Sequence, residues 1–222
     1  MWALIWDFGG PVLLTPFELR ATAERRLGLA SGTFAWSGPF DPASDPDWRA
    51  MQAGEFTERE YWHHRADEYA AISGDPGGAA GLKPLFDELF QGSVEELTRP
   101  GAWDLTRDAK AAGKLVAVLT NDMHAFHDAG WIERMTFLRE VDVLVDGSLE
   151  GLLKPDPRIF QLVLDRLGVR AEEAVFVDDQ PGNCDAAAAL GLHAVQFDVT
   201  APKVAYATAR ELLGIAPEGA SI

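Results

Sequence analysis

The stretch Ala3-Leu4-Ile5-Trp6-Asp7-Phe8-Gly9-Gly10-Pro11, near the start of this 222-residue chain, decides how the rest of the sequence is interpreted. It begins with a short apolar run, which an aspartate, two glycines and a proline then bring to an end. A short apolar run bounded by turn residues indicates a strand buried on both faces and followed by a tight turn. The sequence therefore predicts a buried parallel strand with Asp7 at its carboxyl end.

From Arg99 onward, segments with helical periodicity alternate with further short apolar runs. Strands that alternate with helices favour a parallel sheet covered by helices on both faces. We therefore expect an α/β fold with a Rossmann-like, three-layer core. The expected strands are 115–119, 141–145, 174–177 and 194–197, and the expected helices are 100–112, 131–139, 156–167, 183–190 and 202–213.

A different pattern lies between the first strand and this alternating region. Thr15 and Thr57 are each followed three residues later by a glutamate, which is the capping-box pattern of a helix start. No strand-like alternation interrupts this part of the chain. The expected segments are a helix from 15, a helix over 57–71, a Gly-rich loop over 73–81 and a helix over 83–90. The predicted domains are a core over 1–15 and 98–222 and an inserted helical cap over 16–97.

Composition excludes several classes of partner. The chain has 35 acidic and 19 basic residues, for a net charge of −16. Such a charge repels nucleic acid and anionic membranes, so we expect neither as a partner. The single cysteine, Cys184, rules out an intrachain disulfide. Because Met1 leads into a short apolar stretch with no basic segment before it, we expect a cytoplasmic protein without a secretory signal. A monomer and a homodimer both remain open.

Polar side chains follow the expected strands at the points where the strands end. Asp7 follows the first strand, Thr120 and Asn121 the second, and Asp178 and Asp179 the fourth. Any one of these residues is explained equally well as a turn or cap residue. Ligands of such folds bind at the carboxyl ends of the strands, however, and Lys154 adds an ammonium group just before a helix. Together, the four segments predict one polar site at this edge of the sheet.

The segment 6–12 resembles motif I of the haloacid dehalogenase superfamily, whose usual form is Asp-x-Asp-Gly-Thr/Val. Three further segments resemble motifs II, III and IV in the same order: Leu119-Thr120-Asn121, Lys154-Pro155, and Val177-Asp178-Asp179 with Asn183. The region 16–97 is similar in position and helical character to the C1 cap of subfamily I. The stretch 7–18 is most similar to the branch that contains the N-terminal phosphatase domain of soluble epoxide hydrolase and bacterial sugar-phosphate phosphatases.

This resemblance implies a Mg²⁺-dependent phosphatase that hydrolyses a small phosphorylated metabolite through an aspartyl-phosphate on Asp7. A carboxylate is able to attack a phosphoryl group and divide one difficult displacement into two easier steps. Mg²⁺ prefers hard oxygen ligands. The expected ligands are Asp7, the carbonyl of Gly9 and Asp179, with Asp178 acting through water.

The remaining site residues are expected to bind the phosphoryl group. Lys154 neutralises the phosphate and the nucleophile together, and Thr120 donates from its hydroxyl. Backbone N–H groups of Asn121 and of the Gly9-Gly10 turn complete the expected donors. With the metal and the lysine counted, we expect a locally positive site in an acidic protein.

Gly9 is a departure from the motif, because the family's second aspartate, its usual general acid and base, belongs at this position. General acid and base catalysis is typically worth about 10²–10⁴-fold in rate. Three interpretations stay open: a phosphatase that uses another group or an easy leaving group, a slow or specialised enzyme, and a binding or regulatory protein that has lost catalysis. Pro11 is a milder departure, which removes one backbone N–H from the loop.

A 2-haloacid dehalogenase is an alternative, because such enzymes also lack the second aspartate and need no metal. The resemblance argues against it, since they carry a tyrosine or similar residue at the position of Gly9 and Ser-Ser-Asn-like residues at the positions of Asp178 and Asp179. Adjacent carboxylates without a cation also repel each other. A metal site therefore explains the acidic pair better.

His124 and His127 follow motif II at a spacing of three residues. Two histidines without a third ligand do not make a zinc site. A surface role and a role in substrate contact both stay open for them. The identity of the substrate is expected to depend on cap residues, which carry no readable code.

Overall fold

The computed structural model describes residues 1–73 and 82–216. The chain divides into two compact units, one made of Met1–Leu14 and Ser93–Ile222, the other of Thr15–Gly92. The predicted boundaries were 15/16 and 97/98. A short helix, α5 (Val94–Leu97), lies in the first unit, where the Leu14 N–H donates to the Leu97 carbonyl over 2.8 Å.

The first unit contains a five-stranded parallel sheet with the order β3-β2-β1-β4-β5. The strands are β1 (Ala3–Trp6), β2 (Leu115–Thr120), β3 (Val143–Asp146), β4 (Ala174–Asp178) and β5 (His193–Gln196). The first strand of the chain is the central one, and its residues are fully buried. A strand buried on both faces needs apolar side chains throughout, which explains the continuous apolar run of its sequence.

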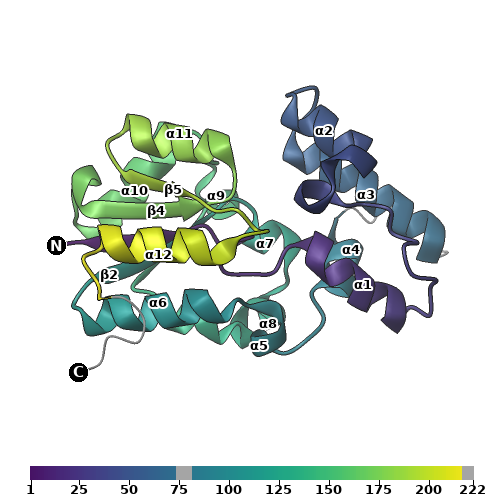
Figure 1. The fold of residues 1–222 in the computed structure, drawn as a ribbon, viewed down its shortest axis with the longest axis horizontal. Coiled ribbons are helices and arrows are strands. Elements are labelled where there is room, and N and C mark those ends of the chain that lie inside the picture. Colours follow the sequence, from purple (N-terminus) through teal and green to yellow (C-terminus); the bar gives the residue numbers. More distant parts are fainter. Residues whose placement is uncertain (74–81, 217–222) are drawn as a thin grey trace. The chain divides into compact units, whose positions relative to one another are not determined.

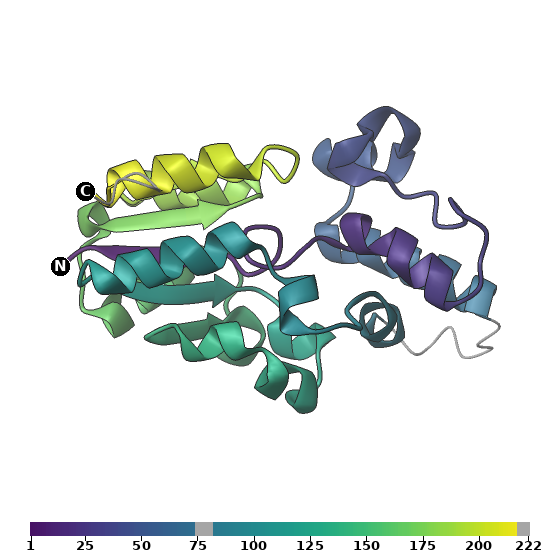
Figure 2. The ribbon, with the colours of Figure 1, turned by 60° about the horizontal axis from the view of Figure 1, so that its bottom comes forward.

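Helices cover both faces of this sheet (Figures 1 and 2). α6 (Pro100–Ala111) and α12 (Pro202–Leu212) pack together over one face, while α10 (Pro157–Leu167) and α11 (Pro181–Ala189) cover the other. Trp6 of β1 points to the α6 and α12 side, because its indole N–H donates to Thr106 over 2.9 Å. Ile5 joins the core cluster beneath α10 and α11. The structure thus confirms the predicted three-layer α/β fold.

Short elements connect the strands and helices of this unit. They are α7 (Met123–Phe126), α8 (Ala129–Arg134), α9 (Gly147–Glu150), and the 3-10 turns η3 (Thr136–Arg139) and η4 (Ala171–Glu173). The helix expected over 131–139 is interrupted, because Met135 has a non-helical ψ of 80°. The strand expected from 141 begins at Val143, because the Asp142 carboxylate accepts the Val116 N–H over 2.8 Å and replaces a ladder hydrogen bond.

The second unit is helical, as the sequence predicts. Its elements are α1 (Pro16–Arg26), η1 (Gly38–Phe40), η2 (Pro42–Ser44), α2 (Pro46–Gln52), α3 (Glu58–Ser73) and α4 (Lys83–Leu89). Thr15 and Thr57 form the expected capping boxes with Glu18 and Glu60. Phe17 lies against Trp48, with ring centres 5.2 Å apart, in an aromatic core. Of the Gly-rich loop expected over 73–81, residues 74–81 lie outside the described residues.

Among the described residues, no helix has both the length and the apolar character needed to cross a membrane.

Candidate active site

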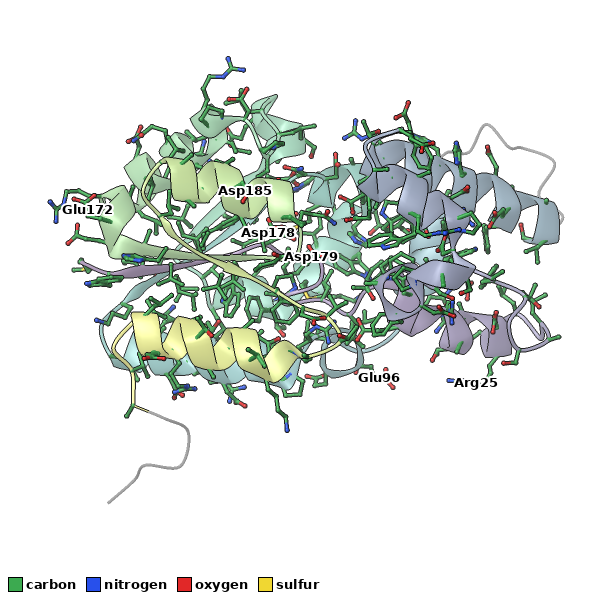
Figure 3. The ribbon with its side chains drawn as sticks, turned by 45° about the horizontal axis from the view of Figure 1, so that its top comes forward. Arg25, Glu96, Glu172, Asp178, Asp179 and Asp185 are labelled. Carbon is green, nitrogen blue, oxygen red and sulfur yellow. The ribbon has the colours of Figure 1, made fainter. Side chains whose placement is uncertain are left out.

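Three of the predicted site segments meet at the carboxyl edge of the sheet. Asp7 directly follows β1, and its N–H donates to the Val177 carbonyl of β4 over 2.8 Å. Thr120 is the last residue of β2 and Asp178 is the last residue of β4. Asp179 comes next to Asp178 at this strand end (Figure 3). In a parallel sheet the strands all end at the same edge, so the segments come together although they are far apart in sequence.

Lys154 is a buried cation at the centre of this group. Its Nζ lies 2.7 Å from Oδ1 of Asp7 and 2.6 Å from Oδ2 of Asp178. The side chain of Lys154 is only 2% exposed, and that of Asp178 is fully buried. Both ion pairs are therefore shielded from water. In such a buried place, electrostatic interactions are stronger than at the surface.

Asn121 holds the backbone of Lys154 in place. Its Oδ1 accepts the Lys154 N–H over 2.7 Å, and its Nδ2 donates to the Lys154 carbonyl over 3.1 Å. The side chain of Asn121 thus links the loop that carries Lys154 to the end of β2. The sequence predicts only a backbone role in phosphate binding for Asn121, and these two hydrogen bonds add a positioning role for its side chain.

The Asp178 carboxylate, at the end of β4, is held by hydrogen bonds in a similar way. Oδ1 of Asp178 accepts the Gln180 N–H over 2.8 Å, and Nδ2 of Asn183 donates to Oδ1 and Oδ2 over 3.2 and 3.1 Å. Asn183 belongs to the resemblance with motif IV, but no role followed from its sequence position. The structure places it as a support that orients the Asp178 carboxylate.

The three carboxylates of Asp7, Asp178 and Asp179 form one cluster. Each offers an oxygen atom within 4.8 Å of those of the other two. Burial and the Asp178 carboxylate raise the pKa of Asp7 to about 7, against the opposing effect of Lys154. Burial by itself lowers the pKa of Lys154, but Asp178 and Asp7 raise it above its usual value. The two shifts have different causes: burial is the main cause of the raised pKa of Asp7, whereas the neighbouring carboxylates raise that of Lys154.

The two glycines after Asp7 differ in whether the structure has room for a side chain at their positions. Gly10 has a φ of +85°, and an added Cβ would lie 3.0 Å from the Asp179 carboxylate, so a side chain is strained and crowded there. Gly9 has no such restriction, because its φ is not positive and a Cβ would meet only Oδ2 of Asp7, at 3.9 Å. The space for a side chain at position 9 is therefore present, although this chain places none there.

The two histidines after motif II have separate surroundings. Nδ1 of His124 lies 2.7 Å from Oδ2 of Asp146, at the end of β3. The imidazole of His127 is buried and stacks on Trp131, with ring centres 3.6 Å apart. Among the described residues, neither histidine belongs to a group that is able to hold a metal. Asp146 had no place in the sequence analysis, because nothing in its local sequence distinguishes it from a turn residue.

A family model for haloacid dehalogenase-like hydrolases matches residues 41–191. The chain belongs to this family. Membership agrees with the motif residues and with the order of the sheet, and it makes the chain a hydrolase of the α/β class described above.

Curated relatives include proteins of different activities. The chain is 31% identical over 216 residues to acyl-CoA dehydrogenase family member 10 of Mus musculus, covering 96% of this chain and 19% of that protein. It is 30% identical over 116 residues to (S)-2-haloacid dehalogenase 4A of Burkholderia cepacia, covering 52% of this chain and 50% of the relative. It is 33% identical over 143 residues to ribulose-1,5-bisphosphate 5-phosphatase of Halopiger xanaduensis, covering 64% and 58%. The chain therefore spans less than two thirds of the length of each of these three relatives.

Solved structures show the same fold. The putative HAD-hydrolase YfnB from Bacillus subtilis superposes with a TM-score of 0.65 at 19% identity, over 88% of this chain and 86% of that one. At this level of identity the likeness concerns the fold alone. Because both phosphatases and dehalogenases occur among the relatives, the chemistry of this chain has to be argued from its own residues.

Proposed function

We propose that the chain is a Mg²⁺-dependent phosphatase that hydrolyses a small phosphorylated metabolite, with Asp7 as the nucleophile. The observation that carries the proposal is the cluster of Asp7, Asp178 and Asp179 around the single buried ammonium group of Lys154. Three carboxylates and one lysine leave an excess of negative charge in a buried place. A bound cation removes that excess, and a metal-free site has no comparable use for an acidic pair beside the nucleophile.

The donor set fits Mg²⁺, because the oxygen atoms of carboxylates are the hard ligands that this ion prefers. Asp7, Asp179 and the carbonyl of Gly9 would hold the ion, with Asp178 acting through water. When bound there, Mg²⁺ supplies positive charge that offsets the charge of the phosphoryl group and of the attacking carboxylate.

The residues around Asp7 support its role as nucleophile. Its Oδ1 is engaged by Lys154, so Oδ2 is the oxygen atom that attacks phosphorus. The P–O bond to the leaving group then breaks, and the leaving oxygen takes a proton from water. A second water molecule then attacks the phosphorus of the aspartyl-phosphate and gives a proton to the hydroxide left by the first step, while the P–O bond to Asp7 breaks, which releases inorganic phosphate and restores the Asp7 carboxylate. Lys154 balances negative charge throughout, with Thr120 and the N–H groups of Asn121 and the Gly9-Gly10 turn as donors to the phosphoryl oxygens.

Dehalogenation of a 2-haloacid is the second candidate, and the lack of an aspartate at position 9 is the observation that favours it. An aspartate nucleophile also displaces halide from carbon, and that reaction needs no acid at position 9. The Burkholderia cepacia relative is named as such an enzyme. The buried Asp178 next to Asp179 favours the phosphatase, because a dehalogenase gains nothing from the added negative charge.

The first experiment compares these activities in one preparation. p-Nitrophenyl phosphate and a panel of phosphorylated metabolites are assayed with Mg²⁺ and with EDTA, and 2-chloropropionate is assayed for chloride release. We expect phosphate release that needs Mg²⁺ and is lost in Asp7→Asn, at least about 10³-fold, because the amide is not a nucleophile. Chloride release that persists in EDTA, without phosphate release, would replace the phosphatase by a dehalogenase. No turnover of either kind would make the chain a binding protein.

The second experiment restores the missing acid. Because the structure leaves space at position 9, Gly9→Asp is expected to fold and to raise kcat for metabolite phosphates by about 10²-fold, within the usual range for general acid and base catalysis. p-Nitrophenyl phosphate, whose leaving group needs no proton, serves as the matched substrate and should gain little. An equal gain, or equal loss, on both substrates would show that position 9 does not act on the leaving group.

A further inference from the structure

The Gly9–Gly10 peptide lies between two residues without side chains, although two of its atoms have proposed roles in the site. Its carbonyl is a proposed metal ligand, and its N–H is a proposed phosphate donor. Consecutive glycines lack the side chains that restrict backbone rotation, so this peptide would sample many orientations if nothing else held it. The contacts on either side of it therefore decide how well the proposed ligands are placed.

On the side of Asp7, the backbone itself holds the loop. The Phe8 carbonyl accepts the Leu13 N–H over 2.8 Å. Since the carbonyl of Phe8 and the N–H of Gly9 belong to one planar peptide, this hydrogen bond sets the orientation of both.

On the other side, a side chain from a distant part of the chain holds the loop. Nε of Arg99 donates to the Gly10 carbonyl over 2.6 Å. This carbonyl belongs to the Gly10–Pro11 peptide, which has no N–H with which to form a local hydrogen bond. One peptide further, the Tyr206 hydroxyl donates to the Pro11 carbonyl over 2.8 Å. The Gly9–Gly10 peptide is thus bracketed by two planes that are each anchored.

Arg99 is itself held firmly. It is buried, and its guanidinium carbon lies 5.4 Å from the centre of the Phe197 ring. Its backbone N–H donates to the Val12 carbonyl over 2.8 Å, and the next residue, Pro100, begins α6. A buried arginine loses little further entropy when it makes one more hydrogen bond, so it is suited to fixing a flexible carbonyl.

Tyr206, which donates to the Pro11 carbonyl, is also closely packed. An added Cβ on Gly101 would lie 2.5 Å from the ring of Tyr206, so the glycine at the start of α6 makes room for this ring. The approach of α12 to the loop therefore depends on a residue two positions after Arg99.

We infer that Arg99 is a positioning residue of the active site, which fixes the Gly9–Gly10 peptide through the Gly10 carbonyl so that its carbonyl and N–H face the reacting group. This inference rests on the proposed function for the meaning of that orientation, but the fixing of the loop is measurable without any activity. Arg99 does not touch the substrate in this scheme. It acts through the loop.

The structural test follows the Gly10 amide, which belongs to the Gly9–Gly10 peptide itself. Gly-Gly occurs twice in the chain, at 9–10 and 77–78, so labelling with ¹³C-carbonyl, ¹⁵N-glycine leaves two amide resonances in a carbonyl-edited spectrum, and Gly78→Ala identifies that of Gly10. We expect the ¹H–¹⁵N heteronuclear NOE of this amide to be that of a rigid backbone in the wild type. It should fall clearly in Arg99→Gln and in Arg99→Lys, because lysine keeps the charge but places a carbon atom where Nε donates.

The functional test asks whether this order matters for the reaction. In both Arg99 variants we expect kcat for p-nitrophenyl phosphate to fall about 10- to 100-fold, as for misplaced catalytic groups, and the half-saturating Mg²⁺ concentration to rise. Tyr206→Phe, which frees only the next carbonyl, should have a smaller effect. Arg210→Lys is the matched control, since Arg210 is an arginine of the same unit whose ion pair is with Asp108 and not with the loop.

Unchanged order of the Gly10 amide in Arg99→Lys would overturn the inference, as would equal losses of order in Arg99→Lys and Arg210→Lys. If the wild type hydrolyses no phosphate, the proposed function fails, and the amide measurement alone still decides whether Arg99 fixes the loop. If Arg99→Gln fails to fold, the lysine variant carries both tests.

Discussion

Two buried aspartate sites, one in each compact unit, solve the problem of a buried charge in opposite ways. In the helical unit, Asp45 is 2% exposed and is held by neutral hydrogen-bond donors. Its Oδ2 accepts hydrogen bonds from the N–H groups of Ser37 and Gly38 and from the Tyr61 hydroxyl, over 3.1, 3.0 and 2.8 Å. Its Oδ1 accepts the Trp48 N–H over 3.0 Å and so caps α2.

The pKa values of Asp45 and Asp7 are therefore shifted in opposite directions. Burial by itself raises the pKa of Asp45, but the hydrogen bonds from Trp48, Gly38, Tyr61 and Ser37 outweigh it and hold the pKa below its usual value. At the sheet edge, burial and a neighbouring carboxylate raise the pKa of Asp7 to about 7. Donors satisfy Asp45 completely, whereas the carboxylates at the sheet edge still need positive charge.

The comparison separates a structural carboxylate from a functional one. A carboxylate that only holds a loop is surrounded by neutral donors and gains nothing from a further ligand. A cluster in which carboxylates outnumber cations is costly to keep, and the cost is justified by a ligand or a reaction that uses the charge. The excess of carboxylates therefore supports the sheet edge as the active site, whereas the neutral donors around Asp45 give that residue a role in the fold of the helical unit.

The largest expected effect comes from Lys154→Met at pH 8, which leaves two buried carboxylates without their ammonium group. We expect the free energy of unfolding to fall by about 3–5 kcal/mol, the usual cost of breaking a buried ion pair. Urea unfolding followed by circular dichroism measures it. Lys110→Met is the matched control, because the ion pair of Lys110 with Asp142 is longer, at 3.7 Å, and partly exposed. Its loss should stay below about 1 kcal/mol. Equal losses in the two variants would contradict the account of the sheet edge.

A smaller effect is expected for Asp45→Asn, about 2–3 kcal/mol at pH 7, because the amide is neutral and donates from one side where the carboxylate accepts. The pKa of Asp45 is lower in the folded than in the unfolded chain. Its contribution is therefore complete above about pH 4 and is lost as the pH falls through the lowered folded-state pKa. The difference in stability between wild type and variant should shrink from pH 7 to about pH 2.5. Tryptophan fluorescence in urea follows both, and a difference that grows on acidification would refute the assignment.

The smallest expected effect is that of Tyr61→Phe, which removes one of the donors to Asp45. We expect a loss of about 1–2 kcal/mol, as for a hydrogen bond to a charged acceptor. Burial and the Asp45 carboxylate raise the pKa of Tyr61 above its usual value, so its hydroxyl stays a donor. The loss of stability in the double variant with Asp45→Asn should be smaller than the sum of the losses in the two single variants. Strict additivity would mean that the hydroxyl does not act through Asp45.

Much of the fold was predictable because its signals are local. The continuous apolar runs mark strands buried on both faces, the capping boxes at Thr15 and Thr57 mark helix starts, and alternation of the two elements implies a parallel sheet. The interruption at Met135 and the late start of β3 at Val143 were not predictable, because a backbone angle and a hydrogen bond from Val116 to Asp142 decide them.

The sequence by itself determined which side chains reach the edge of the sheet. Asp7 directly follows a strand, Thr120 and Asp178 each end one, and parallel strands end together. Only the tertiary structure decided which groups pair there. Lys154 bridges Asp7 and Asp178, Asn121 holds the backbone of Lys154, and Arg99 reaches the Gly10 carbonyl across 89 positions of sequence. Sequence patterns report local backbone preference and burial, whereas the partner of a buried polar group is set by packing between distant segments.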